Sequence, residues 1–290
     1  MRADRPSAAW AAVAPQLVLA PIRQLDFRVA DKETRNKMKY SVVIPAFNEE
    51  QNVPIVAEQV SAALDLLGAP WEIIFIDDGS TDGTYRAMET CRATEPRVKI
   101  IRFKRNFGQS LGWRAGFDHA SGEIIISMDA DLQNDAQDIP AMVRKLEEED
   151  YDVISGWRGE RKDATHLRFL SAVGNWLRRL LTGDAIHDQG CSLKVYRRKC
   201  LEGLDFCGDL HRRYITAILR WKGYRVGELK IRHHRRRYGS SKYTIRKKWN
   251  GILDLLVVAF WIQHSTQPVH SAGAAYAIDH LEGFRETMPS

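Results

Sequence analysis

Cysteine and long hydrophobic runs are both scarce in this chain, and each shortage excludes a class of protein. Its four cysteines form no C-x-x-C pair and have no metal-ligand spacing to histidine, so the sequence indicates neither a zinc site nor a disulfide framework. The apolar segment 251–262 is shorter than the roughly 20 residues that a helix needs to cross a bilayer. The signatures G-x-x-x-x-G-K-[ST] and strand-linked G-x-G-x-x-G are absent as well, which disfavours a P-loop protein, a kinase or a dehydrogenase.

The composition that remains is that of a globular protein with an excess of positive charge. The 290 residues are enough for one sizeable core and additional segments, and the net charge is +6. Such a charge favours a phosphate-bearing partner or an anionic membrane surface. We expect a poorly ordered N-terminal extension over 1–38, a main domain over 39–248, an amphipathic or interfacial helix over 249–265 and a C-terminal tail over 266–290. The extension is either a short regulatory or membrane-touching tail or lies upstream of a natural start at Met38.

Short apolar runs alternate with helical periodicity from residue 40 onward. Strands are expected at the β-branched runs 40–45, 71–77, 98–102, 123–128 and 152–156. Helices are expected between them, after Pro54, Gly83, Gln109 and Asp138. Near-continuous apolar strands separated by helices predict an α/β fold with a mostly parallel sheet and helices on both faces.

Three of the predicted strands end in polar, acidic segments, at 45–50, 77–84 and 129–133. Parallel sheets bind ligands at the carboxyl ends of their strands. We therefore expect the three segments to meet at one edge of the sheet and to form a binding site. In the first segment, Asn48 and Glu49 suit either ligand contact or helix capping.

The segment 129–133 has the pattern of a site for a hard divalent cation. Asp129 and Asp131 are separated by one residue where a strand gives way to a loop, so both carboxylates can turn toward one ion. Gln133 can supply a third oxygen, and Mg²⁺ or Mn²⁺ suits such ligands. An ion with few protein ligands keeps positions open for phosphate oxygens. A lone D-x-D is more often a solvated turn, but an isoleucine-rich strand directs this one toward the ligand edge.

The segment 77–84 is a tight glycine turn with more carboxylates than a turn requires. Asp77 and Asp78 are adjacent and can accept hydrogen bonds from a base or a ribose. We expect Ser80 and Thr81 to cap the helix that follows.

Taken together, three motifs of the chain resemble a known family. SVVIPAFNEE, IIFIDDGSTDGT and SMDADLQ, in this order and spacing, look like family 2 glycosyltransferases with the GT-A fold. Over roughly residues 38–265 the chain is similar to polyprenyl-phosphate sugar transferases, the group of dolichyl-phosphate mannosyltransferase and bacterial undecaprenyl-phosphate glycosyltransferases. The further motifs are GWR at 156–158, NW at 175–176, HDQGCSL at 187–193, HR at 211–212 and YGSSKY at 238–243.

The resemblance implies a metal-dependent enzyme that moves a hexose, with inversion, from a UDP- or GDP-sugar to undecaprenyl or dolichyl phosphate. It places the nucleotide sugar at Pro45, Phe47, Asn48, Glu49, Asp77, Asp78, Asp129 and Ala130. It implies a Mg²⁺ or Mn²⁺ ion at Asp129, Asp131 and Gln133, and Asp129, Asp131 and Asp188 as the catalytic residues. A phosphate dianion is already nucleophilic, so no strong general base is required, and His187 is expected to be structural.

An acceptor phosphate requires positive charge, and the basic run 232–248 holds eight Lys or Arg residues and no carboxylate. By family position the acceptor phosphate is assigned to Arg158, Arg212, Arg237 and Lys242, with Arg168 and Arg178 as weaker candidates. A basic run can also be a solvated face or bind nucleic acid, but nothing here resembles a nucleic-acid-binding fold. The apolar segment that follows favours a membrane surface as partner and the cytoplasmic face of a membrane as location.

The segment after residue 250 departs from the family's pattern and leaves alternatives open. Many bacterial members continue with a pair of transmembrane helices, whereas 251–262 is short and polar residues follow it. We expect either a peripheral enzyme held by the basic run and an interfacial helix, or a chain whose end has been lost or altered. A soluble family 2 transferase acting on a saccharide or protein hydroxyl, with Asp188 as its base, is one alternative function. A nucleotide-binding protein without turnover is another, and the sequence leaves the sugar, the base and the oligomeric state open.

Overall fold

The computed structural model describes residues 38–159, 186–204, 208–236 and 276–284, without the side chains of residues 208–213. The segments 1–37 and 249–265 therefore lie outside the described residues. So do the side chains of five candidate residues, Arg168, Arg178, Arg212, Arg237 and Lys242. No helix within the described ranges has the length and apolar character that a bilayer span requires.

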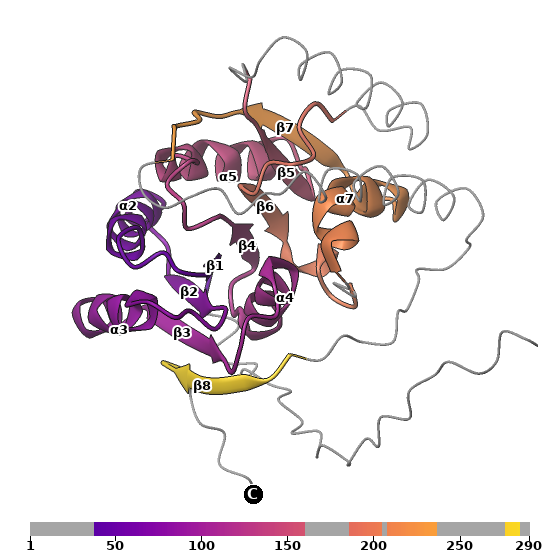
Figure 1. The fold of residues 1–290 in the computed structure, drawn as a ribbon. Helices are drawn as coiled ribbons and strands as arrows, with labels where there is room; N and C mark the ends of the chain where they lie inside the picture. Colours follow the sequence, from indigo (N-terminus) through magenta and orange to yellow (C-terminus); the bar gives the residue numbers. More distant parts are fainter. Residues whose placement is uncertain (1–37, 160–185, 205–207, 237–275, 285–290) are drawn as a thin grey trace, which may run out of the picture.

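One eight-stranded sheet forms the centre of the described structure, in the strand order β7-β5-β6-β4-β1-β2-β3-β8 (Figure 1). The strands are β1 Tyr40–Ala46, β2 Trp71–Asp77, β3 Val98–Phe103, β4 Ile124–Ser127, β5 Val153–Trp157, β6 Lys194–Arg197, β7 Val226–Lys230 and β8 Ile278–Glu282. Four pairs are parallel: β1 with β2, β1 with β4, β2 with β3, and β5 with β7. β6 runs antiparallel to β4 and β5, and β8 runs antiparallel to β3. The mostly parallel sheet predicted from the alternating pattern is confirmed.

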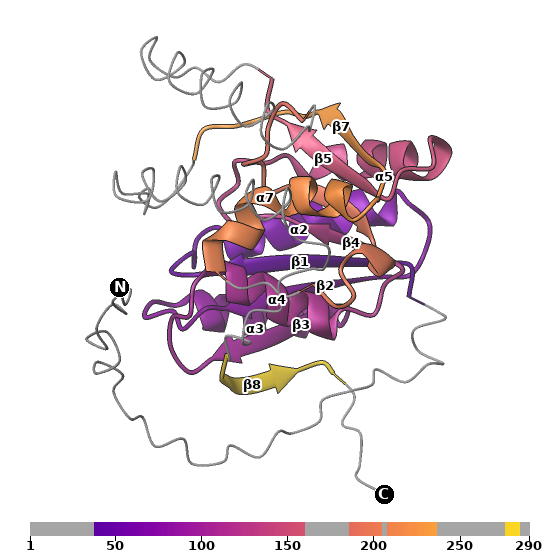
Figure 2. The same ribbon diagram turned by 90° about the vertical axis from the view of Figure 1, so that its right-hand side faces the viewer.

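Helices cover both faces of this sheet, as Figures 1 and 2 show. One face carries α2 Val53–Asp65, α3 Thr84–Thr94 and α5 Ile139–Glu148. The other face carries α4 Gln109–His119 and α7 Gly208–Trp221. Two short 3-10 turns, η1 Ala136–Asp138 and η2 Arg198–Cys200, complete the described elements.

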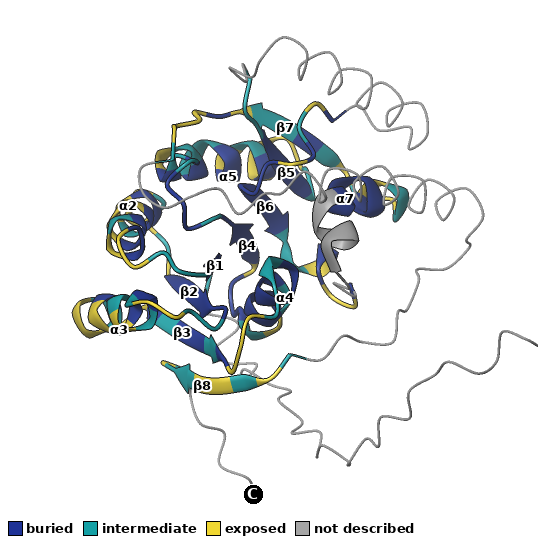
Figure 3. Cartoon of the chain, viewed as in Figure 1, coloured by how far each residue is buried: buried dark blue, intermediate teal, exposed yellow. Residues whose placement is uncertain are grey.

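The central strands are apolar on both sides because each side is covered. Within β1, Val42 and Ile44 belong to the core beneath α2, and Val43 belongs to the core beneath α4. Every residue of β1 and β2 is buried, and Figure 3 shows these strands in dark blue between helices whose outer faces are exposed. Burial on both faces explains why these strands are continuous apolar runs rather than alternating ones.

The last strand, β8, lies in the segment that we expected to be a tail and instead extends the sheet along β3. Next to it, the ring of Tyr276 stacks on Phe103 with ring centroids 5.3 Å apart. Glu282 accepts a hydrogen bond from the Tyr85 hydroxyl (2.8 Å) and lies 3.7 Å from Nε of Arg92. The edge of β3 is therefore covered by a segment far away in the sequence.

Candidate functional site

The three acidic segments meet at the carboxyl ends of β1, β2 and β4. Arg236 joins the first and third segments, because its Nη1 lies 3.5 Å from Oε1 of Glu49 and its Nη2 lies 2.7 Å from Oδ2 of Asp131. The first and second segments are joined where the backbone amide of Asn48 donates to Oγ of Ser80 (3.0 Å). The predicted meeting of the three segments is confirmed.

Asp77 ends β2 with a fully buried carboxylate. Its Oδ1 accepts a hydrogen bond from the backbone amide of Ser80 (2.9 Å). Its Oδ2 lies 3.5 Å from Nε of Arg102 and accepts no hydrogen bond from the part of the chain that the structure describes. The expected capping of α3 by Ser80 and Thr81 is wrong. Gly83 is the N-cap, and the carboxylate of Asp82 accepts the backbone amide of Thr84 at the first residue of the helix (3.0 Å).

Asp78 holds the loop that precedes α4. Its carboxylate accepts the backbone amides of Phe107 (2.7 Å) and Gly108 (2.9 Å). The next residue, Gly79, has φ +67°, and a Cβ there would lie 2.3 Å from the backbone carbon of Arg105. Only glycine permits this close approach, so the two loops form one packed wall of the site.

The metal-candidate loop turns sharply after β4. Asp129 is half-buried and accepts a hydrogen bond from the side-chain amide of Gln109 at the start of α4. Leu132 has φ +59°, a left-handed conformation that costs energy for a leucine and is frequent near functional sites. This turn lets the backbone amide of Gln133 donate a hydrogen bond to Oδ1 of the buried Asp131 (3.1 Å).

The chemistry of this loop fits a hard divalent cation. Asp129 and Asp131 offer carboxylates and Gln133 an amide oxygen, which are ligands that Mg²⁺ and Mn²⁺ accept. The guanidinium of Arg236 already lies against Asp131, so this carboxylate faces positive charge. Within the described ranges no group of three or more His, Cys, Asp or Glu side chains is arranged to hold a metal ion. An ion held here would therefore need further ligands, such as phosphate oxygens.

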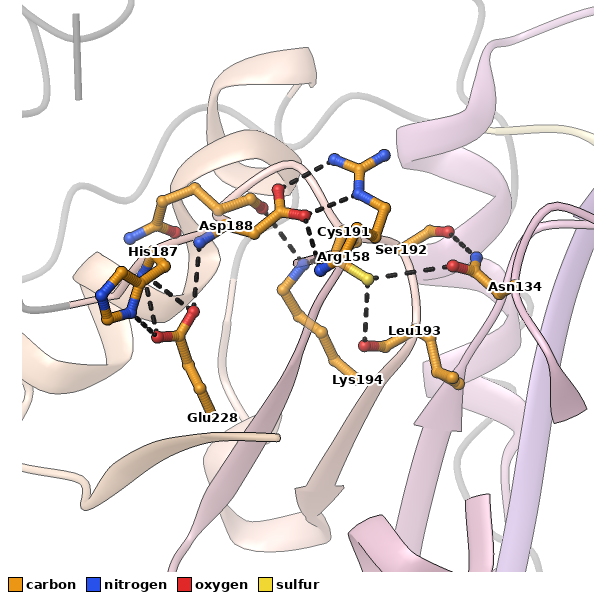
Figure 4. A network of polar contacts seen from close by, with 10 residues as sticks. Asn134, Arg158, His187, Asp188, Cys191, Ser192, Leu193, Lys194 and Glu228 are labelled. Carbon is orange, nitrogen blue, oxygen red and sulfur yellow. Dashed lines mark hydrogen bonds and ion pairs between the residues drawn. The ribbon is translucent and has the colours of Figure 1, made fainter. Parts of the chain in front are cut away.

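A largely buried ion pair joins Arg158, directly after β5, to Asp188 (Figure 4). The Nε of Arg158 lies 2.6 Å from Oδ2 of Asp188, and its Nη2 lies 2.8 Å from Oδ1. Burial opposes the charged form of Arg158, but the hydrogen bonds and charge of Asp188 raise the pKa of the guanidinium above its usual value. Asp129 contributes to the same rise, so Arg158 lies within electrostatic range of the metal-candidate loop.

The residues around Asp188 form a supported loop. The ring of His187 stacks on Trp157 with ring centroids 4.7 Å apart, and its Nδ1 lies 2.8 Å from Oε2 of Glu228. These contacts give His187 a place in the packing of the loop.

Other residues that the resemblance assigned lie at the same edge. Pro45 is in β1, Phe47 follows it, and Ala130 is buried between the two metal-candidate carboxylates. Among the residues that contact the predicted set, Gln109, Arg236 and Glu228 were not predicted as site residues. Arg236 lies in the basic run that predicted phosphate-binding residues, but the family resemblance assigned the neighbouring Arg237 instead.

The first part of the basic run faces carboxylates rather than solvent alone. The Nη2 of Arg232 lies 2.9 Å from Oδ1 of Asp138, and its Nη1 lies 3.2 Å from Oδ2 of Asp135. The hydrogen bond that the guanidinium of Arg232 donates to Asp138 raises the pKa of Arg232. Together with Arg236, at least two cations of the run are engaged with the protein itself.

Sequence comparison relates this architecture to known proteins. Residues 41–204 match the sequence profile of glycosyl transferase family 2. The dodecaprenyl-phosphate galacturonate synthase of Rhizobium johnstonii is 40% identical over 242 residues, which cover 82% of this chain and 71% of that protein. The undecaprenyl-phosphate 4-deoxy-4-formamido-L-arabinose transferase of Yersinia enterocolitica is 36% identical over 254 residues, which cover 87% of this chain and 75% of that protein.

Solved structures show the same fold. The glucosyl-3-phosphoglycerate synthase of Mycobacterium tuberculosis in complex with UDP superposes with a TM-score of 0.56 at 20% identity, covering 79% of this chain and 82% of that one. A mannosyltransferase of Pyrobaculum calidifontis in complex with GDP-Man and Mn²⁺ gives 0.55 at 21% identity, covering 79% and 66%. The sequence match, the relatives and the architecture agree: the chain belongs to glycosyl transferase family 2 and has the GT-A fold.

Proposed function

We propose that this glycosyltransferase moves a sugar from a nucleotide diphosphate sugar to a polyprenyl phosphate such as undecaprenyl phosphate. The observation that carries the proposal is that an acidic loop, Asp129 to Gln133, and the largely buried cation Arg158 lie at the same edge of the sheet. They follow β4 and β5, which both run antiparallel to β6. The acidic loop suits a metal-bound diphosphate, and the cation suits a second phosphate beside it. The names of the two relatives, which refer to dodecaprenyl phosphate and undecaprenyl phosphate, support this choice of acceptor.

On the donor side, the proposal assigns the nucleotide to the wall formed by β1 and β2. The Oδ2 of the buried Asp77 accepts no hydrogen bond from the described residues, so it can accept one from a base or ribose. Asp129, Asp131 and Gln133 would hold Mg²⁺ or Mn²⁺, which when bound neutralises the charge that develops on the leaving diphosphate. Arg236, already 2.7 Å from Asp131, would lie beside the same phosphates.

On the acceptor side, Arg158 would bind and orient the lipid phosphate. A phosphate oxygen then attacks the anomeric carbon of the sugar while the bond from that carbon to the diphosphate breaks on the opposite side. The nucleoside diphosphate leaves and the anomeric configuration is inverted. Both oxygens of Asp188 face Arg158, so we assign this carboxylate to holding the guanidinium rather than to removing a proton.

The remaining assignments follow from charge and sequence. The cations of the run 232–248 that lie outside the described residues, including Arg237 and Lys242, would add to the acceptor site or contact anionic lipid. Arg212, placed on α7 by its backbone, would belong to the same group. We propose a peripheral location on the cytoplasmic face of a membrane, with the segment 249–265 at the interface.

The test is transfer of radiolabel from UDP- and GDP-sugars to polyprenyl phosphate in detergent, with Mg²⁺ or Mn²⁺ or with a chelator. We expect label in the lipid phase that requires the metal and is lost in Asp131→Asn. Calorimetric binding of UDP and GDP with Mn²⁺ gives a second readout that does not depend on turnover. Exposed Glu148→Gln on α5 is the matched control and should leave both readouts unchanged.

Each result points to a different conclusion. Transfer to lipid supports the proposal and identifies the donor. Metal-dependent nucleotide binding without transfer to lipid rules out the lipid acceptor, and label on a saccharide or protein then identifies a soluble-acceptor enzyme. Nucleotide binding without any transfer indicates a binding protein.

A further inference from the structure

We infer that Glu228 is a positioning residue for the acceptor phosphate, because it fixes the backbone that places Asp188, and Asp188 orients Arg158. Neither the family resemblance nor the predicted site included Glu228. The inference rests on the proposed role of Arg158 in acceptor binding.

The carboxylate of Glu228 accepts hydrogen bonds from N–H groups near the start of the loop 186–193 (Figure 4). Its two oxygens accept the backbone amide of His187 at 2.8 and 2.9 Å. Its Oε1 also accepts the backbone amide of Asp188 (3.1 Å), and its Oε2 lies 2.8 Å from Nδ1 of His187. Only 12% of the Glu228 side chain is exposed, whereas half of the His187 side chain is.

Asp188 passes this constraint on to Arg158. Its backbone amide is held by Glu228, while its carboxylate accepts Nε, Nη2 and the backbone amide of Arg158, the last at 3.3 Å. In Figure 4 the two carboxylates lie on different sides of the residue 187–188 backbone. A shift of this backbone would therefore move the carboxylate that sets the direction of the guanidinium.

The strand pairing fixes the position of Glu228 relative to Arg158. β7 pairs with β5 in parallel register, with Ser155 opposite Glu228 and Trp157 opposite Lys230. Arg158 follows Trp157 directly, so its backbone and the carboxylate that orients its side chain are both tied to β7. Rigid strands place functional groups more accurately than a free loop does.

The rest of the loop has its own supports, which limits the role of Glu228 to the part that carries Asp188. The ammonium group of Lys194, which is buried, donates to the carbonyl oxygens of Gln189 (3.2 Å) and Cys191. The side chain of Gln189 also accepts a hydrogen bond from Thr216 on α7. Loss of Glu228 should thus loosen residues 187–188 and leave the later residues in place.

The experiment measures steady-state kinetics of Glu228→Ala and Glu228→Gln with nucleotide sugar and polyprenyl phosphate varied separately. We expect the KM for polyprenyl phosphate to rise about tenfold in the alanine variant, because a misplaced binding group weakens only the ligand it holds. The KM for the nucleotide sugar should stay within about twofold, since the proposed nucleotide wall at β1 and β2 is separated from β7 by three strands. The glutamine variant keeps one acceptor oxygen and should give an intermediate KM for the lipid. Glu148→Gln makes the same change of side chain at an exposed position and is the matched control.

A double mutant separates positioning from general destabilisation. If Glu228 acts through Asp188, then adding Glu228→Ala to Asp188→Asn should raise the acceptor KM little further. Full additivity of the two changes, or equal effects on both substrates, would overturn the inference. An acceptor KM that stays at the unmodified value in Glu228→Ala would overturn it as well.

Amide hydrogen exchange distinguishes a failure of the positioning role of Glu228 from a failure of the proposed function. If the unmodified chain transfers no sugar to lipid phosphate, the proposed function fails whatever the variants do. The positioning role is then decided by exchange at residues 187 and 188, which should become faster in Glu228→Ala while exchange at Leu193 in the same loop is unchanged. Unchanged exchange at 187 and 188 would overturn the inference.

Discussion

Arg158 holds a buried positive charge whose geometry matters as much as its sign. Its planar guanidinium makes two parallel hydrogen bonds to Asp188, which a lysine ammonium cannot reproduce. We expect Arg158→Lys to raise the KM for polyprenyl phosphate by about tenfold or more while the KM for the nucleotide sugar changes little. Kinetics with each substrate varied in turn give the answer.

The exposed Arg220, at the end of α7, supplies the matched control for this substitution. Arg220→Lys should behave as the unmodified chain does. If Arg158→Lys kept its acceptor KM, charge alone would suffice at this position and the role of the fixed guanidinium would be refuted.

The described cysteines are predicted to be unreactive in the folded chain. Burial raises the pKa of Cys191 to about 11 and that of Cys200 to about 12, and it raises the pKa of Cys91 as well. At about pH 8 the reactive thiolate is therefore rare in the folded state, whereas an unfolded cysteine with a pKa of about 8.5 reacts readily. A disulfide reagent should modify these three residues slowly in buffer and rapidly in concentrated guanidinium chloride, with mass spectrometry to locate the label.

The same shifts give a direction for stability. Unfolding lowers these thiol pKa values, so the unfolded chain releases protons first as the pH rises. The contribution of the three thiols to the free energy of unfolding is complete below the unfolded pKa and falls as the pH rises above about 8.5. In the modification experiment, fast reaction of Cys191 in native buffer would contradict the burial of its thiol.

The positions of individual residues could be predicted where the local sequence has a recognisable pattern of strand and loop. Asp77 ends one apolar strand and Asp129 comes two residues after another, so their place at the carboxyl edge of the sheet could be predicted from the chain alone. Gln109, Arg236 and Glu228 could not be found in this way, because each contacts its partner across a long stretch of sequence. Their residue types are also common on solvated surfaces, which leaves no local signal.

At the scale of elements, the predicted strands correspond to β1 to β5, whereas β6, β7 and β8 were not predicted. β1 to β5 are short and rich in β-branched residues, and the α-helices between them have proline in their first turn or glycine at the N-cap. β8 escaped prediction because Ile278–Glu282 has only two apolar residues, Ile278 and Leu281, and no local feature shows that β3 has an open edge. Its place depends on pairing at long range, which a local pattern does not encode.

The attachment of β8 should depend measurably on Glu282. This side chain accepts the hydroxyl of Tyr85 and lies near Arg92, and both partners are partly buried. We expect Glu282→Ala to lower the free energy of unfolding by about 1 kcal/mol, the usual net value of one such hydrogen bond. Urea unfolding followed by circular dichroism measures it.

The same strand contains a control, because Asp279 is exposed. Asp279→Ala should change the free energy of unfolding by less than about 0.5 kcal/mol. Equal effects of the two substitutions would show that the contacts of Glu282 do not hold the strand.

For the molecule as a whole, charge predicts how it meets a membrane. The net charge is +6, and eight cations fall within the run 232–248. We expect the chain to co-sediment with vesicles that contain anionic lipid and to be released as the salt concentration approaches about 1 M, where the screening length falls to about 3 Å. Vesicles of neutral lipid are the control, and binding that ignores both lipid charge and salt would refute an electrostatic contact.

The pairing of β8 with β3 also has a consequence in terms of effective concentration. β8 and β3 belong to one chain, so the covalent connection is a tether that keeps the strand near its partner. A tether of this kind typically supplies a local concentration of millimolar order. A strand of five residues forms too few contacts to bind tightly as a separate peptide. A chain cut between residues 237 and 275 should therefore lose β8 on dilution, and a synthetic peptide of residues 276–290 should restore the edge only at roughly millimolar concentration.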